Sequence, residues 1–457
     1  MLGHIASTLK SHDKSVFAHV IVSLQFPLVK LLLTVLTEVA VFISYTLELW
    51  QRDIALAQEA GIDGFVLNIS PPYDDTTRTQ ISNAFEAAST TRLGFSLFFS
   101  FDYLGSGITW LLNDVIEVLG AFCTNPIYYK LKGAAVVSTF EGTRNTDDWP
   151  RIRRSIPSET CFVPDWTSLG PAGVASKLEI IDGAFSWDMW PDGANEITSH
   201  SDRAWKDALG PTKTFMMGVS PWFYTRLPAY GKAWVWRGDS TWHTRWQQIA
   251  ELQPSLVQIV SWNDYGESHY IGPIHEEGIP SATGADARPY VKNMPHDCWR
   301  MLLPFYIAQY KNGGIPPPIE KEILVFWYRL SPAAAGCNSG LTGNNAPSDI
   351  NLSAHQEFVP PHEVCEDRVF VTVLLQAVAT AKVKFEGEGV QNSTAYQVPT
   401  AGASHFSVPF KENLGPVTVQ VMRNDQVIMY STGPEITKYP PGGITNYNAW
   451  VGGASAS

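Results

Sequence analysis

The sequence is poor in charged residues for its length. Asp, Glu, Lys and Arg make up 17% of the 457 residues, whereas about a quarter is usual. The formal net charge is −12. A surface with this acidic balance repels polyanions. We therefore expect neither nucleic acid nor a membrane surface among the partners of this chain.

Several signatures of common enzyme classes are also missing. The five cysteines form no CxxC pair, and no Asp/His group has the spacing of metal ligands. No glycine-rich phosphate-binding pattern follows a predicted strand, and there is no Gly-x-Ser-x-Gly nucleophile motif. These absences disfavour a doubly wound nucleotide-binding fold. We expect the protein to need no metal and no cofactor.

Long hydrophobic runs are absent as well. The most apolar stretch, Phe26–Ser44, is interrupted by Lys30 and Glu38, so its runs are too short to span a bilayer. Met1–Ser15 lacks the apolar segment of a signal peptide.

Aromatic residues, in contrast, are abundant. Phe, Trp and Tyr make up 12% of the chain, including 16 Trp. An excess of Trp over charge is typical of proteins that bind neutral carbohydrate. A large aromatic core is the alternative explanation.

Strand-like and helix-like segments alternate through the first 310 residues, which predicts a (β/α)8 barrel over residues 1–313. The expected strands are Val16–Val22, Gly64–Ile69, Gly94–Phe101, Ala134–Thr139, Thr160–Val163, Gly183–Trp187, Phe215–Val219 and Leu256–Trp262. The expected helices are Leu47–Ala60, Thr79–Thr90, Ile108–Leu119, Ser201–Leu209, Thr241–Leu252 and Pro295–Asn312.

The residue pattern changes after a Pro/Gly linker at residues 314–320. Residues 321–457 contain short β-rich runs that are separated by turn residues, which predicts a small antiparallel β-sandwich. The runs are Ile323–Tyr328, Val369–Leu375, Ala381–Phe385, Val417–Met422 and Val427–Tyr430.

The segment Val260-Ser-Trp-Asn-Asp-Tyr-Gly-Glu-Ser-His-Tyr-Ile271 is the most informative part of the chain. Asp264 and Glu267 follow a buried strand and are flanked by Trp262, Tyr265 and His269. Glycoside hydrolysis needs two carboxylates beside apolar surfaces for sugar rings. On composition alone, acids that cap a helix would explain the segment equally well.

The other predicted strands end in similar groups. In a (β/α)8 barrel the strands' C-terminal ends form the active site, so these residues are expected to share one carbohydrate cleft. The set comprises His19, Asn68, Asp102, Tyr103, Glu141, Asp165, Trp166, Trp187, Asp188, Trp222 and Tyr224.

These residues fall in motifs that resemble glycoside hydrolase family 71, the fungal α-1,3-glucanases called mutanases. The motifs include Val16-Phe-Ala-His19, Phe98-Phe-Ser-Phe-Asp102, Ser138-Thr-Phe-Glu-Gly142, Phe162-Val-Pro-Asp-Trp166, Gly183-Ala-Phe-Ser-Trp-Asp188, Val219-Ser-Pro-Trp-Phe-Tyr224, the segment at 260–271 and Asn446-Tyr-Asn-Ala-Trp450. Together they cover most of residues 47–452.

The resemblance implies a secreted or cell-wall enzyme that hydrolyses α-1,3-glucan with inversion at the anomeric carbon. It places the catalytic carboxylates on Asp264 and Glu267. Side-chain reach favours Glu267 as general acid and Asp264 as general base, and an inverting pair should stand roughly 6.5–9.5 Å apart. We expect a monomer.

Residues 23–44 depart from the family pattern, because apolar residues replace a short loop after the first strand. We interpret them as translated intron sequence, which would also account for the missing signal peptide. An alternative function is therefore an inactive carbohydrate-binding relative that this insertion has disabled. Without the resemblance, another barrel hydrolase such as an esterase or amidase would also fit.

Overall fold

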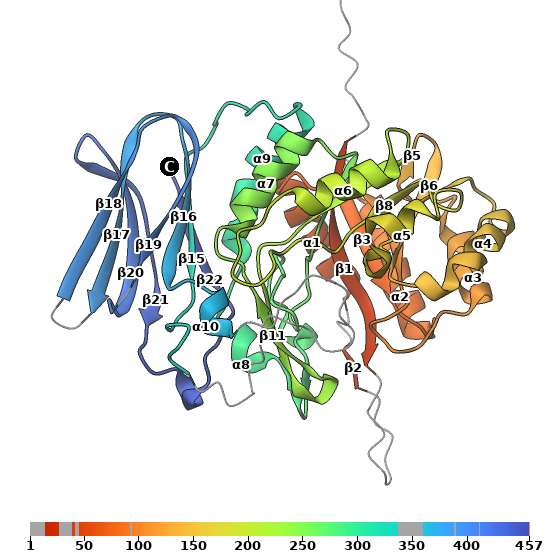
Figure 1. Cartoon of the computed structure of the whole chain (residues 1–457), viewed down its shortest axis with the longest axis horizontal. Coiled ribbons are helices and arrows are strands. Elements are labelled where there is room, and N and C mark those ends of the chain that lie inside the picture. The colour runs from red at the N-terminus through yellow and green to blue at the C-terminus, as the bar shows by residue number, and fades with distance from the viewer. Residues whose placement is uncertain are drawn as a thin grey trace, which may run out of the picture.

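The computed structural model describes residues 14–26, 39–41, 45–91, 94–336, 360–387, 390–410 and 412–456. An α/β part lies beside two C-terminal antiparallel sheets (Figure 1). Within the described residues, no helix is both long and apolar enough to cross a membrane.

The α/β part is built around a curled sheet in which eight strands run parallel, among the residues that the structure describes. Their order is β8, β9, β12, β1, β3, β4, β6, β7. Their bounds are β1 Ser15–Phe26, β3 Gly64–Ile69, β4 Ser96–Asp102, β6 Ala134–Phe140, β7 Thr160–Phe162, β8 Gly183–Phe185, β9 Thr214–Val219 and β12 Leu256–Ile259. Strand β3 is buried along its whole length, as expected for a sheet that is covered on both faces.

Every strand expected in this part is present, and the largest difference is in the first. β1 does not end at Val22 but continues to Phe26, where it pairs antiparallel with β2 (Val39–Val41). Residues 23–44, which we interpreted as intron sequence in place of a short loop, therefore contain strand residues at 23–26 and 39–41. Residues 27–38 and 42–44 lie outside the described residues.

Pairing is thinnest between β7 and β8. A single residue, Asp165, forms isolated parallel bridges to Phe140 at the end of β6 and to Phe185 in β8. β5 (Lys130–Leu131) pairs antiparallel with the start of β6.

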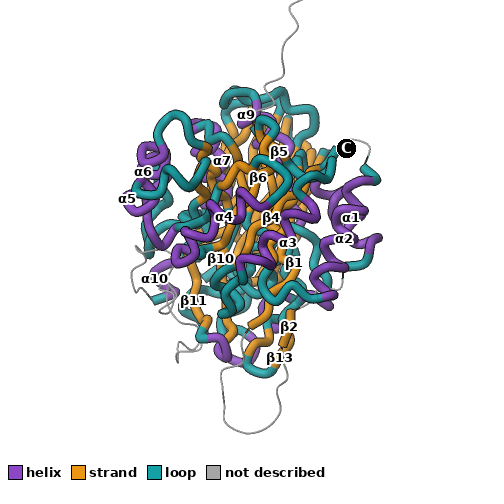
Figure 2. Tube along the Cα trace, turned by 90° about the vertical axis from the view of Figure 1, so that its right-hand side faces the viewer, coloured by secondary structure: helices purple, strands orange, loops and turns teal. Residues whose placement is uncertain are grey.

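Helices connect most of the parallel strands and pack around the sheet (Figures 1 and 2). They are α1 Leu47–Glu59, α2 Asp75–Ser89, α3 Leu112–Phe122, α4 Trp149–Ser155, α5 Gly170–Ala175, α6 His200–Leu209, α7 Thr241–Leu252, α8 Arg288–Val291 and α9 Leu303–Lys311. α2 begins four residues before the expected Thr79, because the Asp74 side chain accepts a hydrogen bond from Thr77 N at 2.8 Å and caps the helix there.

Two hairpins were not predicted from the sequence. The longer one pairs β10 (Phe223–Leu227) with β11 (Lys232–Trp236), and the shorter one pairs β13 (Ser281–Ala282) with β14 (Ala285–Asp286). In both views β11 lies at the same end of the sheet as β2, which is the end where the parallel strands finish (Figures 1 and 2).

The C-terminal part contains two four-stranded antiparallel sheets with the orders β19-β16-β15-β22 and β18-β17-β20-β21. Their strands are β15 Ile323–Tyr328, β16 Arg368–Leu375, β17 Ala379–Gly387, β18 Val390–Val398, β19 Gly402–Pro409, β20 Gly415–Arg423, β21 Gln426–Ile436 and β22 Trp450–Ser455. Side chains of β17 alternate between buried and partly exposed, so one face of its sheet forms a core with the other sheet. The sequence analysis missed β18, β19 and β22.

The two parts share a buried contact surface. Trp327 of β15 donates its indole hydrogen to Asp239 O at 2.8 Å, and its ring lies 5.9 Å from that of Trp299. The chain between α9 and β15, where the linker was expected, has no regular element. The contact between the two parts therefore depends on side chains and not on this connection.

Candidate active site

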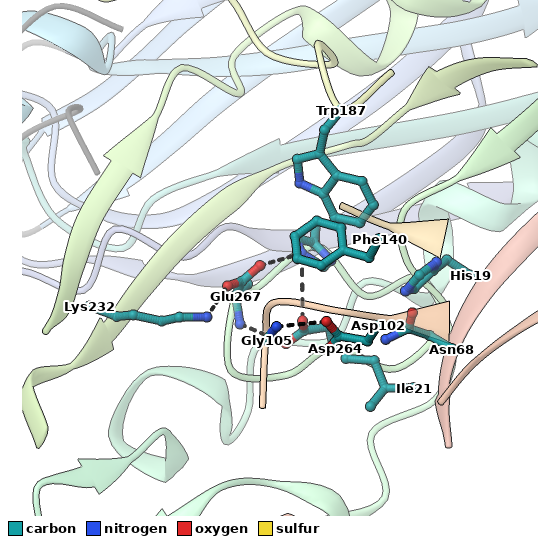
Figure 3. A pocket seen from close by; sticks show the side chains of 11 residues that line it. His19, Ile21, Asn68, Asp102, Gly105, Phe140, Trp187, Lys232, Asp264 and Glu267 are labelled. Atoms are coloured by element: carbon teal, nitrogen blue, oxygen red, sulfur yellow. Dashed lines mark hydrogen bonds and ion pairs between the residues drawn. The ribbon is translucent and has the colours of Figure 1, made fainter. Parts of the chain in front are cut away.

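A pocket opens where the parallel strands end (Figure 3). Its empty volume is about 460 Å³, including the part open to solvent. Residues from five strands and from three loops line it: His19, Ile21, Asn68, Asp102, Gly105, Phe140, Trp187, Lys232, Asp264, Glu267 and His269. Seven of these were expected from the sequence.

The two carboxylates come from one tight turn after β12. Asp264 N donates to Ser261 Oγ at 2.8 Å, and the Asp264 carboxylate accepts a hydrogen bond from Glu267 N at 2.9 Å. An Asp that binds a backbone amide three residues later is a common way to close a turn. This local arrangement brings both acids into the pocket.

The carboxylates lie closer together than expected. One oxygen of each, together with a nitrogen of His269, falls within 4.8 Å of the others. The nearest carboxylate oxygens are therefore closer than the roughly 6.5–9.5 Å expected between the groups of an inverting pair. The reason is a shared partner: His269 Nε2 lies 3.1 Å from Glu267 Oε2 and 3.7 Å from Asp264 Oδ2.

Hydrogen bonds fix the tautomer of His269. Ser261 Oγ accepts the hydrogen of Asp264 N, so its own hydrogen is free to be donated to His269 Nδ1, 2.9 Å away. The imidazole hydrogen then sits on Nε2 and is donated toward Glu267. The turn, the serine and the histidine thus form one buried network.

Lys232, which the sequence analysis did not select, completes this network. It stands at the start of β11, and its ammonium lies 2.6 Å from Glu267 Oε1 (Figure 3). Burial lowers the pKa of Lys232, but the charges of Glu267, Asp264 and Asp102 outweigh burial and raise it. A cation bound between the carboxylates would meet this ammonium, so the cluster of Asp264, Glu267 and His269 suits protons better than a metal ion.

The environment separates the two acids in their affinity for a proton. Burial and the nearby Glu267 raise the pKa of Asp264 to about 6. Burial would also raise the pKa of Glu267, but Lys232 and His269 lower it to about 2. In the free chain the pair therefore holds one proton, on Asp264, across the mildly acidic range.

Polar groups face the carboxylates from across the pocket. His19 receives a hydrogen bond at Nδ1 from Gln258 Nε2 at 3.0 Å, and burial lowers the pKa of His19 to about 3, so its neutral ring carries hydrogen on Nε2. Asn68 is buried, and its Oδ1 has no hydrogen-bond partner among the described residues. Asp102 accepts hydrogen bonds from Leu104 N and Gly105 N.

Other expected residues are not brought to the pocket. Glu141 accepts hydrogen bonds from the backbone and hydroxyl of Ser168, and Asp165 accepts two from Thr167. Asp188 accepts hydrogen bonds from Ser201 Oγ and Trp205 Nε1. Among the residues expected in the cleft, Asp102 lines the pocket with Asp264, whereas Glu141, Asp188 and Trp222 do not and have partners elsewhere.

The same holds for most of the expected aromatic residues, which are buried in the core. Trp222 Nε1 donates to Tyr447 O at 2.8 Å, and Trp262 Nε1 donates to Asp53 Oδ2 at 2.8 Å. Among the expected aromatic side chains, only Trp187 lines the pocket; those that do not are Tyr103, Trp166, Trp222, Tyr224, Trp262 and Tyr265. Much of the Trp excess therefore serves packing, the alternative considered for this composition.

Phe140, Ile21 and Gly105 were also missed. Phe140 and Ile21 are apolar residues next to selected polar ones, and nothing in their local sequence distinguishes them from core positions. Gly105 lies close against Asp102, since a Cβ at this position would stand 2.4 Å from Asp102 Oδ2.

Comparison with known proteins places this site in a family. The model of "Glycosyl hydrolase family 71" matches residues 13–457. The chain belongs to this family. The expectation from the strand-end motifs is therefore confirmed, and the pocket with its two carboxylates is a site in a family 71 glycosidase.

Curated relatives agree with the family assignment. A mutanase of Penicillium rubens is 34% identical over 433 residues, which cover 93% of this chain and 85% of that protein. The glucan endo-1,3-alpha-glucosidase agn1 of Schizosaccharomyces pombe is 32% identical over 459 residues, which cover 97% and 95%. Among solved structures, the GH99 endo-alpha-mannosidase of Bacteroides thetaiotaomicron is 12% identical with a TM-score of 0.45, covering 65% of this chain and 98% of that one.

Proposed function

We propose that this chain is a glucan endo-1,3-α-glucosidase that hydrolyses the glucosidic bonds of α-1,3-glucan. One observation carries the proposal: two partly buried carboxylates, Asp264 and Glu267, line one pocket, and the Lys232 ammonium lies 2.6 Å from Glu267 Oε1. General acid–base cleavage of a glycosidic bond needs one protonated and one ionised carboxyl group. Relatives at 32–34% identity that are named for this substrate support the choice of glucan.

We further infer that the curled sheet is a complete (β/α)8 barrel, with Asp165 joining β7 to β8. The bridges from Asp165 to Phe140 and Phe185 support closure at this point. The domain bounds are then 1–313 for the barrel, 314–320 for the linker and 321–457 for the sandwich. We also propose that the enzyme is a monomer and acts outside the cell or in the cell wall, where its substrate lies.

We propose that cleavage inverts the anomeric carbon. The short distance between the nearest carboxylate oxygens is the observation against it, because retaining enzymes hold the two groups closer together than inverting ones do. The resemblance to family 71 motifs is the ground in its favour. We expect the first product to be the β-anomer by proton NMR. An α-anomer as first product would instead make the short spacing the better guide to mechanism.

Two arguments disagree on which carboxyl group is the general acid and which is the general base. Side-chain reach favours Glu267 as acid, whereas the ionisation of the free chain places the proton on Asp264. Azide can replace the attacking water when the base is missing. Rescue of Asp264→Asn, with a β-glucosyl azide as product, would make Asp264 the base; rescue of Glu267→Gln would make Glu267 the base.

The direct test is release of reducing sugar from insoluble α-1,3-glucan. We expect release by the wild-type chain, and none by Glu267→Gln, which changes one oxygen to a nitrogen and preserves packing. Binding to the glucan without release by wild type would favour an inactive carbohydrate-binding relative. Neither binding nor release, with activity on ester or amide substrates, would favour another barrel hydrolase.

A further inference from the structure

The turn that carries the two carboxylates is held by groups outside it. The Tyr290 hydroxyl donates to the carbonyl oxygen of Gly266 at 2.8 Å, and Tyr224 N donates to the carbonyl oxygen of Glu267 at 3.0 Å. Tyr290 belongs to α8 and is only 2% exposed. Gly266 lies between Asp264 and Glu267, so its peptide orientation bears on both side chains.

Tyr290 is fixed in turn by the C-terminal part of the chain. Asn448 Nδ2 donates to the carbonyl oxygen of Tyr290 at 2.9 Å and lies 3.2 Å from the Tyr270 hydroxyl. Asn448 is fully buried, and its side-chain oxygen Oδ1 accepts a hydrogen bond from Ala449 N at 2.8 Å. The residue directly precedes the β22 region of the sandwich, more than 180 residues beyond the turn.

Neighbouring contacts keep this segment in place. Tyr447 accepts the Trp222 indole hydrogen at its carbonyl oxygen, and the rings of Tyr447 and Tyr224 lie 5.7 Å apart. His296 lies between Tyr270 O and Ala449 O, at 2.8 and 3.0 Å from its two ring nitrogens. The segment is therefore fixed on both sides of Asn448.

We propose that Tyr290 and Asn448 are positioning residues for the turn that bears Asp264 and Glu267. Tyr290 holds the Gly266 peptide, and Asn448 holds Tyr290, so the sandwich helps to orient the acids without touching the substrate. This inference rests on the proposed function. A misplacement of about 1 Å in reacting groups costs roughly 100-fold in rate, so a small loosening of the turn is measurable.

The test compares three variants in the full-length enzyme. Tyr290→Phe removes only the hydroxyl that binds Gly266, and Asn448→Ala removes the amide that binds Tyr290. Tyr310→Phe is the matched control, because its hydroxyl is also buried and donates to Pro254 O at 2.9 Å, outside the turn's contacts. Thermal unfolding by circular dichroism establishes a temperature at which all variants are folded.

We expect Tyr290→Phe and Asn448→Ala each to lower kcat on α-1,3-glucan by about 10-fold, with KM within about twofold of wild type. The double variant should be little worse than either single one, because both act through one chain of contacts. Tyr310→Phe should keep the wild-type kcat.

Two results would overturn the proposal: a Tyr290→Phe enzyme with wild-type kcat, or a Tyr310→Phe enzyme that loses as much as Tyr290→Phe at a temperature where both are folded. The wild-type assay separates these from a failure of the proposed function. If wild type releases no sugar, the assignment of substrate and reaction fails, whereas an active wild type with unaffected variants counts against the positioning role alone.

Discussion

Two pairs of carboxyl groups lie near strand ends in the described part of the chain: a partly buried pair that lines the pocket and a buried pair that does not. Asp264 and Glu267 are surrounded by ionisable groups, Lys232 and His269, and line the pocket. Glu141 and Asp165 are bound by the hydroxyls and backbone of Ser168 and Thr167, which carry no charge. Burial and the neighbouring Glu141 raise the pKa of Asp165 well above its ordinary value.

The two pairs differ in the charge of the groups that surround them. Neutral partners satisfy hydrogen bonds but leave both acids inclined to take up protons. An ammonium beside one acid of a pair separates the two, since Lys232 keeps Glu267 ionised while burial keeps Asp264 protonated. A perturbed pKa alone would not have separated the two pairs; the cation and the opening of the pocket do so.

Neutral substitutions should give the largest contrast between the pairs. We expect Asp264→Asn and Glu267→Gln each to lower kcat by about 10²–10⁴-fold or more, because proton transfer is lost. Binding to insoluble glucan in a pull-down should persist, since the changes are nearly isosteric. Glu141→Gln is the matched control and should change kcat by less than about threefold. Equal losses in all three variants would mean that the two pairs act together.

Removal of the ammonium should make the first pair resemble the second. In Lys232→Met, Glu267 loses the charge that lowers its pKa, and Asp264 loses a smaller lowering effect. Both limbs of the plot of kcat/KM against pH should move to higher pH, and the maximum should fall by roughly 10–100-fold. Ser168→Ala, which removes the hydroxyl partner of Glu141, is the control and should leave the profile in place.

The wild-type pH profile should reveal the shared proton directly. The pKa of Asp264 is raised to about 6, so the proton needed for catalysis is lost above that pH. The pKa of Glu267 is lowered to about 2, so the ionised partner persists down to low pH. We expect a plateau in kcat/KM between about pH 2 and 6 for an enzyme that stays folded, and a tenfold fall per pH unit above it. Undiminished activity at pH 8 would contradict this assignment of the proton.

The comparison also explains what the sequence could and could not predict. Gly64–Ile69 and Thr241–Leu252 have the predicted bounds, because apolar periodicity and flanking glycines act locally. Asp264 and Glu267 were found because both acids lie in one short turn. Lys232 was missed because its partner is 35 residues away and the hairpin that carries it joins two aromatic-rich strands with little alternation.

Long-range contacts account for the misplaced aromatic residues. Trp222 follows a strand end in the sequence, as a cleft residue would, but its indole is covered by Tyr447, 225 residues later. Glu141 and Asp188 have the same pattern of an acid beside an aromatic ring as Asp102, and only their partners in space distinguish them. A pattern at strand ends locates a barrel's active face, but not which side chains reach the cavity.

The smallest expected effect concerns the second pair and is one of stability. Asp165 is fully buried, and its Oδ2 has no hydrogen-bond partner among the described residues. Because its pKa is raised in the folded state, the folded chain binds more protons than the unfolded chain above about pH 4, so this group lowers stability as pH rises. Asp165→Asn removes that cost with little change in shape.

We therefore expect Asp165→Asn to match the wild-type Tm at pH 4 and to exceed it by roughly 1–3 °C at pH 7. Its kcat should stay within about threefold of wild type at both pH values, because the side chain does not line the pocket. Differential scanning calorimetry at the two pH values measures the first effect, and sugar release measures the second. A strong loss of kcat at unchanged Tm would return Asp165 to the substrate-binding role expected from its place at a strand end, and would remove the distinction between the two acid pairs.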